Sequence, residues 1–276
     1  MMISAMKPRL FITFWVFVFS ISCQTYNPFG PDKNDSMTIH TTLAGLNRSA
    51  VCHVLTRMEL MVSAANMDTL SKEMNMDQAG ASVSIQVPAG KNRTFTVNGW
   101  VNSVKLLSGS NTVDLNPGED QQVNIVLRFI SPALIITPSD TSVHSSADLH
   151  LRISTRHIER LATAGIRLEY DSEILQLNSM APCMDFLSHN GGQVAILHQK
   201  LDNEKGIAEC FFSILPASKA VEGNGDLIEL EFRTLKNDST AVTIIADPSV
   251  DTNLGIFDQE AKPITVVSLN GTVRVR

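Results

Sequence analysis

Strict alternation of apolar and polar residues in the second half of the chain constrains the fold more than any other feature. The segment GIRLEY places three apolar side chains on one face and two charged ones on the other: Ile166, Leu168 and Tyr170 against Arg167 and Glu169. The later segment GDLIELEFRT alternates in the same way. A period of two is typical of a β-strand with one buried and one solvated face. The alternation therefore predicts β-sheets with Tyr170 turned inward.

The first 22 residues have the pattern of an export signal. Lys7 and Arg9 precede an apolar run of about a dozen residues from Leu10 to Ile21. Such a run is too short to cross a hydrocarbon core of about 30 Å as a helix. Residues 1–22 are therefore predicted to direct export and to be removed.

Cys23 follows this segment in the sequence FSISC. A small residue before a cysteine at this point resembles the lipobox of bacterial lipoproteins, which implies that Cys23 is acylated and anchors the chain to a membrane, at the cell surface or on its periplasmic face. The alternative is ordinary cleavage after the small-x-small site Ser20-Ile-Ser22, without a lipid. Residues 23–36, rich in Asn, Asp, Pro and Gly, are predicted to form a tether in both cases.

Composition limits the partners of the chain. Its formal net charge is -6, and the sequence contains no basic stripe of the kind that binds nucleic acid. Three cysteines follow the anchor position: Cys52, Cys183 and Cys210. An exported protein can form disulfides, so Cys183 and Cys210 are one candidate pair. In the alternative, Cys52 and Cys210 are small buried hydrophobic residues within strands.

Residues 37–130 contain several short alternating segments separated by turn sequences such as Asn98-Gly99. Met58, Leu60 and Val62 share one face of such a segment. Residues 67–78 are predicted to form a short helix or a loop. Strands at this spacing predict an antiparallel β-sandwich, and the block resembles the immunoglobulin-like modules near the N-termini of many bacterial surface lipoproteins.

Residues 131–276 contain about nine predicted strands. Their order is similar to that of a cohesin domain, the nine-stranded jelly roll that binds dockerins in cellulose-degrading assemblies. The matching segments are GIRLEYDSEIL, the hairpin from GQVAILHQ to GIAECFFSI, GDLIELEFRT and the closing NGTVRV. The resemblance implies an all-β protein in which this jelly roll follows the immunoglobulin-like sandwich, and it implies a dockerin-like partner.

In that family the partner docks on the flat face of one sheet. Mapped onto this sequence, the resemblance implies a partner-binding face that includes Thr163, Arg167, Glu169, Glu209 and Phe211. For Phe211 two alternatives remain: an exposed anchor of the interface, or a ring buried beneath a neighbouring loop.

Two other functions are compatible with this architecture. Related jelly rolls bind polysaccharide, but such sites usually need exposed Trp and Tyr, and Trp100 is the only outward-facing candidate. The other is a structural spacer lipoprotein without a dockerin partner.

No segment predicts catalysis, a cofactor or a metal site. The seven histidines are dispersed, without a His-x-x-x-His pair. Glu229 and Glu231 alternate on one strand face, whereas a glycosidase pair comes from separate elements that flank a cleft. Asp171, directly after a strand, is predicted to hold a turn through backbone N–H groups. The sequence therefore favours a binding protein over an enzyme.

Overall fold

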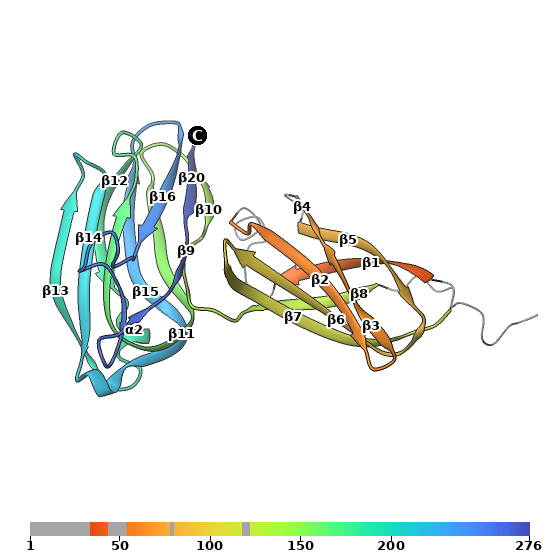
Figure 1. Ribbon diagram of the computed structural model, residues 1–276. Helices are drawn as coiled ribbons and strands as arrows, with labels where there is room; N and C mark the ends of the chain where they lie inside the picture. Colours follow the sequence, from red (N-terminus) through yellow and green to blue (C-terminus); the bar gives the residue numbers. More distant parts are fainter. Residues whose placement is uncertain (1–33, 44–53, 78–79, 118–121) are drawn as a thin grey trace, which may run out of the picture. The chain divides into compact units, whose positions relative to one another are not determined.

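A computed structural model describes residues 34–43, 54–77, 80–117 and 122–276 (Figure 1). The export signal, Cys23, Cys52 and nearly all of the tether lie outside the described residues. In the part that is described, the predicted all-β fold is confirmed: apart from strands, it has only the short helix α2 (Met184–Leu187) and a 3₁₀ turn (Ala217–Lys219). No helix in these ranges is long and apolar enough to cross a membrane.

The first set of strands forms one eight-stranded array in the order β3-β2-β6-β7-β8-β1-β5-β4. Its members are β1 (Asn34–Leu43), β2 (Arg57–Ala64), β3 (Met67–Glu73), β4 (Asn75–Asp77), β5 (Gly80–Pro88), β6 (Gly90–Val101), β7 (Val104–Leu115) and β8 (Val123–Phe129). Met58, Leu60 and Val62 of β2 are buried on one face, as their alternation predicts. The fully buried Phe95 of β6 belongs to the same core.

The prediction of a helix or loop for residues 67–78 is wrong, because this segment forms β3 and β4. β3 pairs antiparallel with β2, from Glu59 opposite Glu73 to Ala64 opposite Met67. It lies at the edge of the sheet and leaves most of its side chains exposed. An edge strand needs little alternation, so the sequence carries a weak signal there.

The second set forms a twelve-stranded network, three strands more than predicted from the sequence within the described residues. Its members are β9 (Ala133–Thr137), β10 (Asp140–Val143), β11 (Asp148–Glu169), β12 (Leu175–Pro182), β13 (Gln193–Asp202), β14 (Ile207–Leu215), β15 (Val221–Thr234), β16 (Ser239–Ile245), β17 (Gly255–Asp258), β18 (Pro263–Ile264), β19 (Val267–Leu269) and β20 (Gly271–Val275). The surplus arises from very short strands such as β18. The predicted domain limits 37–130 and 131–276 stay a prediction.

β11 joins the two layers of this second sandwich. One bent strand runs through residues 148–169. Its first half pairs with β15 and β9, and its second half pairs with β14, β16 and β17. The bend lies at His157 and Arg160, which both have a φ of 52° and interrupt the register. The core between the layers includes Phe212, Phe232 and Ile166.

Candidate partner-binding face

The five residues expected to bind a partner lie on neighbouring strands β11 and β14. In the antiparallel register, Thr163 is opposite Ser213, Arg167 is opposite Glu209, and Gly165 is opposite Phe211. Glu169 follows on β11, opposite Ile207. Intervening residues such as Ile166 and Leu168 are buried in the core. The structure therefore brings all five to one outer face, and their role in binding stays a prediction.

An ion network occupies the centre of this face. Arg167 Nε donates to Glu209 Oε1 at 2.8 Å, and a terminal nitrogen of Arg167 lies 2.7 Å from the same oxygen. That nitrogen is also 3.4 Å from Asp251 Oδ2. The side chains of Arg167 and Glu209 are only 23% and 17% exposed. Both charges are therefore satisfied within the protein, and a partner that covers them meets no unpaired ion.

His198 of β13 extends the network and contacts the predicted anchor. Its Nε2 lies 3.4 Å from Glu209 Oε2. Its ring packs against that of Phe211, with centroids 5.0 Å apart. Phe211 is half-buried, and its ring packs against a side chain of the adjacent strand. Part of the Phe211 side chain thus remains accessible to a partner.

β13 adds exposed apolar side chains that the family mapping did not include. It pairs only with β14 among the described strands, so it is an edge strand. The register shifts between Ile196 and His198, which places a bulge around Leu197. Leu197 is 65% exposed, and Ile196 and Leu201 are also exposed. The signal in the sequence was the run Ala195-Ile196-Leu197, which breaks the alternation of the strand.

The loop of residues 246–254, between β16 and β17, lies against β11, the strand at the opposite end of this face from β13. Asp247 accepts a hydrogen bond from the Ser249 backbone at 2.8 Å, and Asp251 accepts one from the Asn253 backbone at 3.0 Å. These bonds form two tight turns, and the first holds the pKa of the Asp247 carboxyl below its usual value. A Cβ built on Gly165 would lie 1.9 Å from the Asn253 carbonyl oxygen. The loop therefore touches the β11 backbone where only glycine fits.

Asp171 and Tyr170 have the structural roles that the sequence predicted. The Asp171 carboxylate accepts from the Glu173 backbone at 2.9 Å, and its carbonyl accepts from Leu175. Tyr170 is buried, and its hydroxyl donates to Asn203 Oδ1 at 2.7 Å. These bonds fix the turn from β11 into β12.

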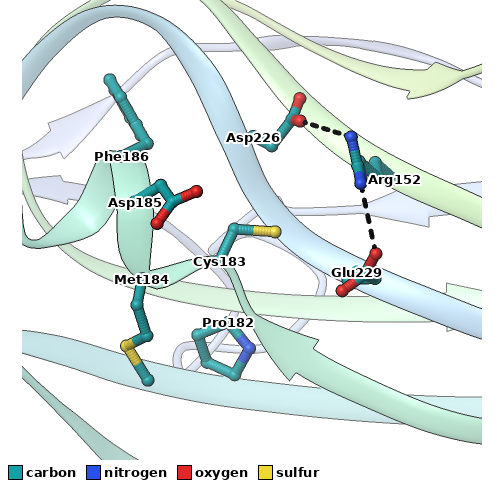
Figure 2. A pocket seen from close by; sticks show the side chains of 8 residues that line it. All are labelled: Arg152, Pro182, Cys183, Met184, Asp185, Phe186, Asp226 and Glu229. Carbon is teal, nitrogen blue, oxygen red and sulfur yellow. Dashed lines mark hydrogen bonds and ion pairs between the residues drawn. The ribbon is translucent and has the colours of Figure 1, made fainter.

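A pocket of about 300 Å³ lies at α2, where strands β11, β12 and β15 also supply side chains (Figure 2). Arg152 lies 3.3 Å from both Asp226 and Glu229, and the hydrogen bond that it donates to Glu229 is the main cause of its raised pKa. Figure 2 shows the Cys183 sulfur pointing toward this pair. Burial, reinforced by the charges of Asp226 and Glu229, raises the pKa of Cys183 to about 11. The thiol is therefore protonated at neutral pH and is a poor nucleophile.

The predicted disulfide between Cys183 and Cys210 is wrong, because both cysteines are free. Cys210 faces the core from the middle of β14, whereas Cys183 lies beyond the end of β12 and lines the pocket. The alternative for Cys210, a small buried hydrophobic residue, is confirmed.

Both thiols are expected to react slowly with iodoacetamide while the chain is folded. Burial also raises the pKa of Cys210 to about 11. At about pH 8 only roughly one thiol in a thousand is ionised at such a pKa, and the labelling rate should rise about tenfold per pH unit up to that value. Mass spectrometry of timed samples measures the rate at each cysteine. Fast labelling of Cys183 at about pH 8 would contradict the burial described here.

In the residues that the structure describes, no group of histidine, cysteine and carboxylate side chains has the arrangement needed to hold a metal ion.

No protein-family model matches this sequence, and no curated protein does. Solved structures that resemble about half of the chain include cohesin domains. A non-cellulosomal cohesin of the archaeon Archaeoglobus fulgidus is 14% identical with a TM-score of 0.41, over 53% of this chain and 91% of that one. A cohesin–dockerin complex from Clostridium thermocellum is 11% identical with a TM-score of 0.43, over 53% of this chain and 99% of that one. A type II cohesin from the cellulosome of Acetivibrio cellulolyticus is 15% identical with a TM-score of 0.42, over 52% of this chain and 95% of that one.

Proposed function

We propose that this chain is a non-catalytic binding protein whose cohesin-like second sandwich docks a dockerin-type protein module. The docking surface is the outer face of β13, β14 and β11. The observation that carries the proposal is the exposed Leu197 in the bulge of β13, next to His198, whose ring packs on the half-buried ring of Phe211. The strand pattern that resembles a cohesin supports the same reading of the sandwich.

The chemistry of the face suits a protein partner. Stable interfaces combine a central apolar contact with charges that are already paired. Leu197 and Phe211 supply the apolar contact, and Arg167 is neutralised by Glu209 and Asp251. Of the seven exposed residues of β13, three are aliphatic and none is Trp, Tyr or Phe, which disfavours stacking of sugar rings on this face. A link to polysaccharide degradation would therefore come through the partner.

Leu197 and Phe211 are expected to be the side chains that matter most for binding. The test uses the chain as bait for secreted proteins of its source organism, followed by titration of the recovered dockerin-bearing protein. Truncating Phe211 or Leu197 to alanine should weaken that affinity by about 2 kcal/mol each if they are central contacts. The matched control is Leu235→Ala, an exposed leucine in the turn after β15, which should bind like the wild type.

Two results would argue against the proposal. If the chain is folded but no dockerin-bearing protein is recovered, the spacer function takes its place. If a dockerin binds with unchanged affinity to both alanine variants, the partner uses another surface.

A further inference from the structure

The first sandwich has a second surface with a distinct chemistry, on the side of β6 and β7 that faces away from the core. Its side chains form cross-strand pairs of hydroxyl and amide groups. In register from one end to the other, these are Thr94 with Thr112, Thr96 with Ser110, and Asn98 with Ser108. The hydroxyls of the first pair are 2.9 Å apart, and Ser108 donates to Asn98 at 2.9 Å.

The row ends in an aromatic ring flanked by two cations. The next pair in the register is Trp100 with Lys105, and Arg57 of β2 is opposite Trp100 on the other side. The Arg57 guanidinium carbon lies 4.1 Å from the centroid of the Trp100 ring, and Lys105 Nζ lies 5.6 Å from it. Both cations are exposed, and within the described ranges neither forms a salt bridge. Two exposed positive charges therefore flank the ring, and the carboxylate of Glu59, opposite Asn98 on β2, lies on the same face.

Hydrogen bonds of the Thr56 side chain hold the backbone around Trp100 in place. Thr56 Oγ1 donates to the Trp100 carbonyl at 3.2 Å and accepts from the Asn102 backbone at 2.9 Å. Asn102 has a φ of 52° and begins the tight turn from β6 into β7. The turn that separates Trp100 from Lys105 is thus tied to Thr56, directly before β2, so a ligand would meet a preformed backbone.

We propose that this surface, defined by the three hydroxyl and amide pairs with Arg57, Trp100 and Lys105, binds an acidic polysaccharide built of uronate sugars. The planar fork of an arginine matches a carboxylate, and lysine adds a point charge. The indole offers an apolar edge to the C–H groups of a sugar. Seven residues of strand from Thr94 to Trp100 extend over about 20 Å, which gives room for several sugar rings beside the hydroxyl groups.

Charge and hydroxyl groups together define the ligand. Exposed cations alone would suit any acidic chain, including an acidic peptide. Asn98 is only 4% exposed, so the donors and acceptors open to a ligand are the hydroxyl groups of the row, which suit a polymer that carries both at every repeat. The site lies on other strands than the docking face of the second sandwich and does not rest on the function proposed for it.

The test measures binding of the full exported chain to soluble polygalacturonate by affinity electrophoresis. Two control polymers separate charge from sugar. Methyl-esterified polygalacturonate has the same sugar backbone without the negative charges. Polyglutamate has the negative charges without the sugar. Arg57→Gln and Lys105→Gln alter exposed side chains, and Trp100→Ala removes the ring. Lys91→Gln, an exposed lysine at the start of β6, is the matched control for loss of charge.

Polygalacturonate is expected to bind, and its methyl ester to bind at least about tenfold more weakly, because charged hydrogen bonds are lost. Arg57→Gln and Lys105→Gln should each cost about tenfold, Trp100→Ala should abolish binding, and Lys91→Gln should change nothing. The proposal would be overturned if polygalacturonate and its methyl ester bound equally well, or if Arg57→Gln and Lys105→Gln left binding unchanged. It would also be overturned if polyglutamate bound as well as polygalacturonate. The last result would make the surface a site for acidic peptides. Thermal unfolding checks that Trp100→Ala is folded, and the two glutamine variants keep the test decisive if it is not.

Discussion

Replacing Gly165 with alanine is expected to lower the free energy of unfolding by about 3 kcal/mol, at the upper end of the usual cost of an overpacked site. The added Cβ would lie 1.9 Å from the Asn253 carbonyl oxygen. Because that oxygen belongs to the backbone, no side-chain rotation relieves the clash, and the loop of residues 246–254 must move off β11. Urea unfolding of the full chain, followed by circular dichroism, measures the loss.

Displacing this loop also alters the docking face, because Asp251 is one of the two carboxylates that hold Arg167. Amide hydrogen exchange in residues 246–254 should therefore speed up in the variant. Gly191→Ala serves as the control: its φ is +75° but nothing lies within 4 Å of a Cβ built there, so it should cost only about 1 kcal/mol. If Gly165→Ala is as stable as the wild type, the loop does not rest on β11.

Replacing Asn203 with alanine is expected to cost about 3 kcal/mol, because three part-buried polar groups lose their hydrogen-bond partner. Asn203 Oδ1 accepts from the Tyr170 hydroxyl at 2.7 Å and from the Leu177 backbone at 2.8 Å. Its Nδ2 donates to the Leu177 carbonyl at 3.0 Å. Asn203 lies in the turn between β13 and β14, so these bonds tie the hairpin of the docking face to β11 and β12.

Tyr170→Phe separates the contributions within this cluster. It removes only the hydroxyl and should cost about 1 kcal/mol. The double variant Tyr170→Phe with Asn203→Ala should lose less free energy of unfolding than the two single variants together, because the two residues share a hydrogen bond. Equilibrium unfolding of the four proteins gives the coupling. If Asn203→Ala lowers the free energy of unfolding by less than Tyr170→Phe does, the hydrogen bonds to Leu177 contribute little.

Alternation, which is local to each strand, predicted which side chains of the proposed docking face point outward, whereas the choice of that face was implied by the resemblance to cohesins. Because side chains point to opposite faces in turn, burying Ile166 and Leu168 requires Arg167 and Glu169 to face outward. The same rule placed Glu209 and Phe211 together on the neighbouring strand. The rule fails at a bulge, where one extra residue interrupts the period, and so Leu197 was missed although it is the most exposed apolar residue of β13.

Contacts between distant segments were not predictable in this way. Asp251 is 84 residues from Arg167, and nothing in its own turn sequence indicates that partner. The choice between a disulfide of Cys183 with Cys210 and a buried free Cys210 stayed open for the same reason, because spacing along the chain does not say which side of a strand or which layer carries each sulfur.

The sequence by itself determined that the described chain is built of β-strands and which face of most strands is buried, because a period of two follows from backbone geometry at each residue. Only the tertiary structure decided that residues 148–169 form one strand shared by two layers, that a loop rests on Gly165, and that Arg57 and Lys105 meet at Trp100. These features depend on how strands pair and close over one another, and that pairing is set by the packing of the whole core rather than by any one segment.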